Sequence, residues 1–217
     1  MKVISLLNQK GGVGKTTLSI NIATVLAKQS GKEGAVLLID ADPQGSSLDW
    51  SGAAGDNKSL VTVMGYPKSN LHQKIEDLGK GRDYVVIDGA PRVTDLARSS
   101  IIASDLVLIP VQPSPYDIWA ANEIVKLIQE AMIYKPSLKA AFVINRKIPN
   151  TTIGRDVRDA LEQFQLPVLS AAVTQRIVFA ESASAGLSVV DVDDKSNAAH
   201  EIKRLTKEIV DLLKGEE

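Results

Sequence analysis

Short apolar runs without polar alternation recur along the chain, and stretches with the apolar spacing of a helix separate them. Runs of this kind are typical of parallel strands that are covered on both faces. They predict strands at 3–7, 35–39, 84–88, 105–111, 139–146 and 166–173. The spacing between them predicts helices at 15–27, 94–103, 117–132, 151–164 and 194–214. This alternation predicts an α/β fold, a doubly wound, mostly parallel sheet with helices on both faces.

The segment 49–80 has the weakest pattern in the chain. Glycine and polar residues dominate 51–57, and a brief apolar run at 60–64 is interrupted by Gly65 and Pro67. A helix is expected at about 70–78. We interpret the segment as a surface excursion. Because the chain shows no internal repeat and no linker composition, we expect one domain over 1–217.

A glycine-rich segment with the sequence NQKGGVGKTT, residues 8–17, joins the first predicted strand to the first predicted helix. Glycines let the backbone fold tightly, so that amide groups point at phosphate oxygens, and the helix N-terminus adds partial positive charge. The segment therefore predicts the phosphate-binding loop of a P-loop NTPase fold. The predicted nucleotide-binding residues are Gly11, Gly12, Val13, Gly14, Lys15, Thr16 and Thr17.

Two lysines distinguish this loop. Lys15 is expected to contact the β- and γ-phosphates, and the hydroxyl of Thr16 is expected to complete the shell of a Mg²⁺ ion. The general pattern has a glycine where this chain has Gln9, and a second lysine, Lys10, follows. Considered alone, Lys10 is also compatible with an ordinary surface lysine.

Aspartates follow two of the predicted strands. Asp40 and Asp42 come at the end of the strand at 35–39, and Asp88 ends the strand at 84–88. Open α/β sheets bind ligands at the carboxyl ends of their strands. Asp88 has the Walker B arrangement, in which a carboxylate holds Mg²⁺ directly or through a water. The alternative for Asp40 and Asp42 is a role as helix-capping or turn residues.

Composition narrows the class of protein. Apolar residues make up 44% and charged residues 24% of the 217 residues, as in ordinary soluble domains. The absence of cysteine excludes a disulfide scaffold, a cysteine–zinc site and cysteine-held iron–sulfur clusters. The net charge of −1 gives no argument for nucleic-acid binding, so any DNA contact must come from a local patch.

The ends of the chain and its apolar runs bear on location. The first strand follows the initial Met1 at once, which leaves no room for a signal peptide. No apolar run approaches the roughly 20 residues that a membrane span needs. We therefore expect a soluble, cytoplasmic protein.

The glycine-rich loop resembles the deviant Walker A motif of the ParA/MinD ATPases, whose signature residue corresponds to Lys10. Residues 37–45 resemble the second motif of this family, and 88–91 with 103–113 resemble its third region and the following strand. Residues 181–186 are similar to a short acidic-to-glycine segment near its C-terminal end. The likeness covers nearly the whole chain and is greatest to short ParA-like partition proteins without an N-terminal helix-turn-helix.

The resemblance implies roles for individual residues, with ATP and Mg²⁺ as cofactors. Lys10 would reach the phosphates bound by the other subunit of an ATP-bound homodimer, and Asp42 would orient the attacking water. With Lys15, these would be the catalytic residues. Asp40 and Asp88 would join Thr16 at the metal. Asn145 would contact adenine, and its alternative is a turn residue at the end of a strand.

The resemblance also implies a function. The ATP-bound dimer would bind nucleoid DNA without sequence preference, and a ParB-type centromere-binding protein or another adaptor would stimulate hydrolysis and release it. This implies a nucleoid-associated protein that segregates plasmid or chromosomal DNA. A related alternative is the positioning of a cargo other than DNA, such as a protein compartment.

Basic residues are candidates for contacts to DNA phosphates, and each is also compatible with an ordinary solvated charge. The candidates are Arg155, Arg158, Arg176, Lys203, Arg204 and Lys207. Many DNA-binding relatives carry an arginine where this chain has Val178, and Arg176 is the candidate substitute. A second departure is Gly89-Ala90-Pro91, where many relatives have two prolines after the aspartate.

Other functions of this scaffold have less support. A MinD-type membrane regulator needs a basic amphipathic C-terminal helix, whereas 207–217 has mixed charge. We expect its apolar side to pack on the sheet and expect no stable membrane association. Nitrogenase-type reductases need cluster cysteines, anion pumps need tandem halves, and the related tyrosine kinases need a tyrosine-rich tail. Amide-ligase relatives remain an alternative.

Overall fold

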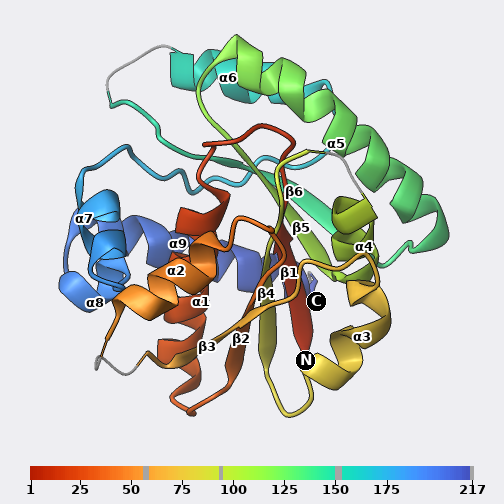
Figure 1. Ribbon diagram of the computed structural model, residues 1–217. Helices are drawn as coiled ribbons and strands as arrows, with labels where there is room; N and C mark the ends of the chain where they lie inside the picture. Colours follow the sequence, from red (N-terminus) through yellow and green to blue (C-terminus); the bar gives the residue numbers. More distant parts are fainter. Residues whose placement is uncertain (56–58, 93–94, 150–152, 216–217) are drawn as a thin grey trace.

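A central sheet with helices on both faces forms the protein, as the computed structural model in Figure 1 shows. The structure describes residues 1–55, 59–92, 95–149 and 153–215, and the side chains of 153–156 lie outside this description. The sheet has six strands in the order β3-β2-β4-β1-β5-β6, and all neighbouring strands are parallel. The strands are β1 (Lys2–Leu6), β2 (Val36–Asp40), β3 (Val61–Gly65), β4 (Tyr84–Asp88), β5 (Leu106–Val111) and β6 (Lys139–Ile144). The predicted doubly wound fold is confirmed.

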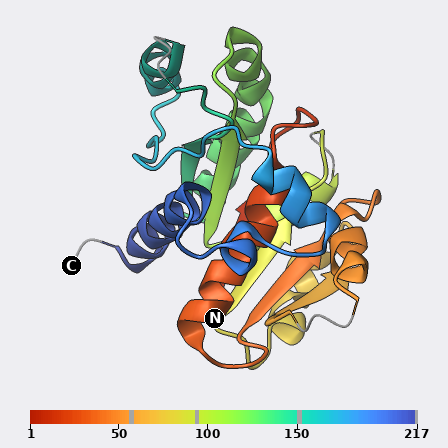
Figure 2. The ribbon, with the colours of Figure 1, turned by 90° about the vertical axis from the view of Figure 1, so that its left-hand side faces the viewer.

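The helices follow the apolar spacing of the sequence in most places. Among the described residues they are α1 (Lys15–Ser30), α2 (Ser46–Ala53), α3 (Leu71–Leu78), α4 (Asp95–Ala103), α5 (Pro115–Tyr134), α6 (Ile153–Glu162), α7 (Val178–Ser184), α8 (Val189–Val192) and α9 (Asn197–Lys214). One face of the sheet packs against α1, α8 and α9, and the other packs against α3, α4, α5 and α6. Figure 2 shows α1 and α9 side by side.

The apolar side of α9 is buried in this core. Ile202, Leu205 and Ile209 are fully buried against the cluster that includes α1 and the sheet. The expectation that this side packs within the protein is therefore confirmed. In the described part of the chain, no helix has both the length and the apolar composition needed to cross a membrane.

The prediction of a strand at 166–173 is wrong. The segment runs beside β6 but makes only two isolated bridges, Phe142 with Val168 and Lys147 with Thr174. Between them, the backbone amides of Ser170 and Ala171 donate to the carboxylate of Glu208 at 2.6 and 2.9 Å. Because these amides turn toward α9 rather than β6, the strand ladder is interrupted.

The interpretation of 49–80 as a surface excursion is also wrong in part. The apolar run contains β3, which pairs with β2 as an edge strand of the sheet. Val61 is buried, whereas Thr62 and Met64 are exposed, so this strand is covered on one face only. The helix expected at 70–78 is α3, but α2 was not expected because it buries only Ser47 and Trp50.

The acidic-to-glycine segment near the C-terminal end brings α7 against α2. A Cβ at Gly186 would lie 2.1 Å from the backbone nitrogen of Ala54, so only glycine fits. The indole nitrogen of Trp50 donates to the carbonyl of Leu187 at 3.2 Å. The helix that follows the Asp42 loop is therefore fixed to the segment between α7 and α8.

The sheet register brings the predicted site residues together. Asp88 of β4 pairs with Leu6 of β1 on one side and with Asp40 of β2 on the other. The glycine-rich loop continues from β1 and lies at the upper edge of the sheet in Figure 1. The loop and both aspartates therefore meet at one point on the carboxyl edge.

Candidate active site

The glycine-rich loop is held by hydrogen bonds to β5 and to the residue that follows it. The amide of Asn8 donates to the Pro110 carbonyl at 2.8 Å, and Gln112 Nε2 donates to the Gly12 carbonyl at 2.9 Å. Gly14 has a φ of 94° and precedes α1, and a Cβ there would lie 2.1 Å from Asn145 Nδ2. Both the backbone conformation and the available space therefore require glycine. The loop amides are thus fixed in a tight turn at the N-terminus of α1, which suits the binding of phosphate.

Lys15 lies inside this turn with an exposed fraction of 7%. Its ammonium donates to the carbonyl of Lys10 at 3.2 Å. Burial lowers the pKa of Lys15 below the ordinary lysine value, and the charges of Asp88 and Asp42 oppose this shift. Because its hydrogen-bond acceptor among the described residues is a neutral carbonyl, the cation is available to an incoming anion.

Asp88 is a buried carboxylate beside the start of α1. It accepts a hydrogen bond from the Ser47 hydroxyl at 2.8 Å. Burial raises the pKa of Asp88 to about 6, against hydrogen bonds from Thr16 and Ser47 that lower it. Thr16 and Asp88 thus present a hydroxyl and a carboxylate at one place, and such hard oxygen ligands suit Mg²⁺.

Asp40 has a different environment. Its carboxylate accepts the backbone amides of Asp42, Ser47 and Leu48 at 3.1, 2.8 and 3.1 Å. Burial raises its pKa, against these bonds that lower it. Asp40 therefore caps α2 and shapes the Asp42 loop, as the capping alternative describes.

No cluster of three or more histidine, aspartate or glutamate side chains that could hold a metal occurs among the described residues. Mg²⁺ bound with a nucleotide takes one or two protein ligands, and phosphates and waters complete its shell. Thr16 and Asp88 fit this demand. Asp40 bonds to backbone amides and its charge raises the pKa of Asp88, and its place at the metal stays a prediction.

Asp42 lies half-buried on the loop between β2 and α2. Its carboxylate accepts the backbone amide of Gln44 at 3.0 Å, and its carbonyl accepts the amide of Gly45. It is also close enough to Lys15 to affect the pKa of that lysine. The loop thus holds a carboxylate beside the phosphate-binding turn.

Lys10 turns away from the turn that holds Lys15. Its ammonium forms an ion pair with Asp117 of α5 at 2.6 Å. The side chain of Lys10 is 40% exposed, whereas that of Asp117 is 1% exposed. In this single subunit Lys10 is therefore bound to its own chain.

Asn145 lies at the end of β6, where both predicted roles are compatible with its contacts. Its Nδ2 donates to the Val13 carbonyl at 2.7 Å, which braces the glycine-rich loop. It also lines a cavity of about 750 Å³ beside the loop. Other residues lining this cavity are Thr17, Arg146, Pro149, Arg176 and Phe179. A cavity of this size can hold a nucleoside.

Three of the basic candidates for DNA contact, Arg158, Arg176 and Lys203, bond to other groups of the protein. Arg158 donates to the carbonyls of Val168 and Leu169, and Arg176 pairs with Glu201 at 2.9 Å.

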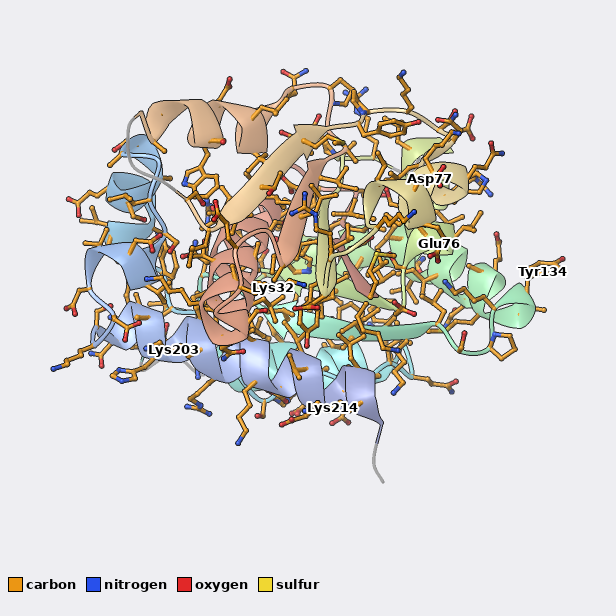
Figure 3. The ribbon with its side chains drawn as sticks, turned by 90° about the horizontal axis from the view of Figure 1, so that it is seen from below. Lys32, Glu76, Asp77, Tyr134, Lys203 and Lys214 are labelled. Atoms are coloured by element: carbon orange, nitrogen blue, oxygen red, sulfur yellow. The ribbon has the colours of Figure 1, made fainter. Side chains whose placement is uncertain are left out.

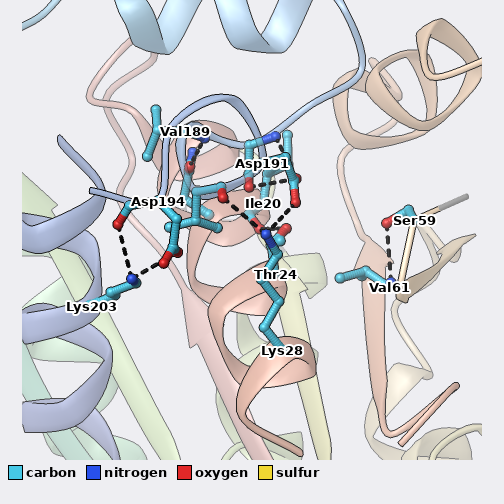
Figure 4. Close-up of polar contacts among 12 residues, drawn as sticks. Ile20, Thr24, Lys28, Ser59, Val61, Val189, Asp191, Asp194 and Lys203 are labelled. Carbon is cyan, nitrogen blue, oxygen red and sulfur yellow. Dashed lines mark hydrogen bonds and ion pairs between the residues drawn. The ribbon is translucent and has the colours of Figure 1, made fainter. Parts of the chain in front are cut away.

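Lys203 pairs with Asp194 at 2.7 Å, as Figure 4 shows. Arg204 and Lys207 are exposed on α9. The side chain of Arg155 lies outside the described residues.

Several residues at the site were not predicted from the sequence. Ser47, Gln112 and Asp117 contact the site across large separations in the chain, as the 107 residues between Lys10 and Asp117 illustrate. The local signal for Asp117 was its position in the first turn of a helix, which is equally typical of an ordinary helix terminus.

Asp88→Asn is expected to stabilise the nucleotide-free protein. Because folding raises the pKa of Asp88 from 3.8 to about 6, its stabilising protonated form is lost as the pH rises through about 6. The shift corresponds to about 3 kcal/mol at most. At pH 7.5 the variant should gain up to this amount in free energy of unfolding, measured by urea denaturation, and at pH 4 most of the gain should be lost.

The same Asp88→Asn variant should bind Mg²⁺-nucleotide more weakly, because an amide is a poorer ligand than a carboxylate. Asp49→Asn, at an exposed position of α2, is the control and should change neither property. An equal gain in stability at both pH values would contradict the assigned environment of Asp88.

Comparison with known proteins agrees with this geometry. The family model for the CobQ/CobB/MinD/ParA nucleotide-binding domain matches residues 4–190. The maintenance of carboxysome distribution protein A of Halothiobacillus neapolitanus is 34% identical over 213 residues, which cover 95% of each chain. The chromosome-partitioning ATPase Soj of Thermus thermophilus is 26% identical over 238 residues, covering 95% of this chain and 94% of Soj.

A solved structure supports the fold. The septum site-determining protein MinD of Pyrococcus horikoshii, complexed with Mg-ADP, aligns with a TM-score of 0.73 at 20% identity and covers 97% of this chain and 96% of its own. The match of the family model extends over most of the chain, and it includes the glycine-rich loop and all three aspartates. The chain therefore belongs to the family of CobQ/CobB/MinD/ParA nucleotide-binding domains.

Proposed function

We propose that the protein is an ATPase that positions a cargo within the cell, and that this cargo is a protein compartment. The observation that carries the proposal is the identity of 34% with a carboxysome distribution protein over 95% of both chains. Identity with the chromosome-partitioning protein Soj is lower, at 26%. Segregation of plasmid or chromosomal DNA is the second candidate, supported by that likeness.

In the proposed reaction, water attacks the γ-phosphate of ATP, and the products are ADP and phosphate. Bound Mg²⁺ would supply positive charge that neutralises the phosphate oxygens. The loop amides and Lys15 bind the phosphates, while Thr16 and Asp88 hold the metal. Asp42 orients the attacking water. The cavity beside Asn145 takes the adenosine.

Lys10 completes the site in a homodimer. Its ammonium binds phosphates held by the second subunit, so that ATP joins the two subunits. Hydrolysis removes the γ-phosphate contacts and separates them. An adaptor protein that recognises the cargo would stimulate this step.

The proposed dimer binds to the nucleoid through contacts to DNA phosphates. Arg204 and Lys207 are the exposed basic residues of α9 among our candidates. With ATP, the hydrolysis-deficient Asp42→Ala protein should co-sediment with plasmid DNA. Its affinity should fall at least about tenfold between 50 and 200 mM salt if a few phosphates are neutralised. Replacing both residues by glutamate should abolish this binding.

The matched control is Lys32→Glu. Lys32 is exposed just beyond the C-terminal end of α1, and Figure 3, which views the protein from below, labels it. This variant should bind DNA like its parent. Binding to anionic liposomes in place of DNA would favour the MinD-type alternative. In host cells, deletion of the gene should cause the protein compartments to cluster and should leave plasmid inheritance unchanged. Plasmid loss with normally distributed compartments would instead identify DNA as the cargo.

A further inference from the structure

The Lys10–Asp117 ion pair joins an exposed lysine of the loop to a buried carboxylate of α5. Asp117 is almost fully buried, and one of its two carboxylate oxygens, Oδ1, has no hydrogen-bond partner among the described residues. The other oxygen, Oδ2, accepts a hydrogen bond from Lys10 alone in the part of the chain that the structure describes. A buried carboxylate that loses its counter-ion is left strongly destabilised. Lys10 is therefore held where it neutralises Asp117.

The backbone of Lys10 is held as well. Its carbonyl accepts the ammonium of Lys15, and its amide donates to the side chain of Asn8 at 3.0 Å. The ammonium that would bind phosphate is thus the same group that contacts the backbone of Lys10.

We propose that Asp117 is a positioning residue that holds Lys10 on its own subunit in the nucleotide-free protein. Binding of Mg-ATP and of a second subunit then releases Lys10. This inference rests on the proposed function, because the released lysine has its target in the other subunit. The triphosphate of ATP carries more negative charge than one carboxylate and so competes for the ammonium.

The ion pair thereby opposes premature dimerisation. Each dimer that forms requires two Lys10 side chains to leave two Asp117 side chains. A factor by which a substitution eases the release of one lysine therefore changes the dimer dissociation constant by the square of that factor. Asp117→Asn keeps a neutral hydrogen bond and removes the charge, which weakens the contact. A gain of about threefold per lysine lowers the dissociation constant of the ATP-bound dimer about tenfold.

Reactivity of Lys10 tests the contact in the nucleotide-free protein. Brief acetylation with an N-hydroxysuccinimide ester, followed by peptide mass spectrometry, compares Lys10 with the exposed Lys32 of the same molecule. Relative to Lys32, Lys10 should react several times faster in Asp117→Asn and in Asp117→Ser than in the wild type. When Mg-ATP is added to the wild type, Lys10 should no longer be paired with Asp117. Equal Lys10 reactivity in the nucleotide-free wild type and both variants would overturn the proposal.

Dimerisation tests the consequence. In the Asp42→Ala background with Mg-ATP, sedimentation velocity should show that Asp117→Asn dimerises at about tenfold lower protein concentration. Asp117→Ser is the second variant, and thermal unfolding confirms that each is folded. An unchanged or weaker dimer would overturn the proposal, because Asp117 would then support Lys10 across the interface. A parent protein that stays monomeric would contradict the proposed function, while the acetylation result still decides the role of Asp117.

Discussion

Replacing Lys15 by alanine is expected to abolish measurable nucleotide binding. Lys15 is the buried cation within the turn of loop amides, and burial lowers its pKa although the charges of Asp88 and Asp42 oppose this shift. Charge-assisted bonds to phosphate in such a site are among the strongest polar contacts. We therefore expect affinity for a fluorescent ATP analogue to fall by at least about a hundredfold, or about 2.7 kcal/mol.

The matched control for this variant is Lys28→Ala, on the same helix. Lys28 pairs with Asp191 at 2.8 Å, as Figure 4 shows, and it also donates to the Val190 carbonyl. Its removal should leave nucleotide affinity unchanged. Lys15→Gln keeps a polar side chain in the turn and guards against misfolding. Retention of wild-type affinity in folded Lys15→Ala would refute the assignment of the phosphate site.

Replacing Asp42 by alanine should separate binding from hydrolysis. Asp40, rather than Asp42, accepts the amides at the start of α2, so the loop should keep its shape when the Asp42 side chain is lost. Positioning of the attacking water would be lost, which should lower turnover by at least about a hundredfold. ATP affinity should stay within about threefold of the wild type.

The expected product of Asp42→Ala is a persistent ATP-bound dimer. Light scattering during size-exclusion chromatography with saturating Mg-ATP measures it, and phosphate release measures turnover. Asp49→Ala, in the first turn of α2, is the control because it changes a nearby carboxylate that is exposed. A strictly monomeric Asp42→Ala protein, or one with normal turnover, would count against the proposed switch.

The fold and the loop could be predicted because consecutive residues carry their signals. Unbroken apolar runs mark the central strands, and strand, glycine turn and helix follow each other directly in the loop. The edge strand β3 was missed because water reaches one of its faces, which weakens the apolar run. The false strand at 166–173 has a strand-like composition, but the carboxylate of Glu208 removes two of its amides from the ladder.

The site residues show the same division. The roles suggested for Lys15, Thr16 and Asp88 fit their positions, since the parallel register brings the strand ends together. The alternative role of Asp40 as a cap could be weighed only when its three amide partners were placed. The partner of Lys10 lies 107 residues away, and local sequence contains no trace of such a pairing.

The central position of β1 has a consequence for the biogenesis of the protein. Its two neighbours, β4 and β5, come from residues that are translated much later, and the Asn8 contact to Pro110 spans 102 residues. At about 5–20 residues per second, the first strand waits roughly 4–16 seconds for β4 and longer for β5. The brace from Asn145 to the loop closes later still, across 132 residues. The nascent chain therefore exposes an apolar strand before it can hold nucleotide, and contacts of such long range make folding slow.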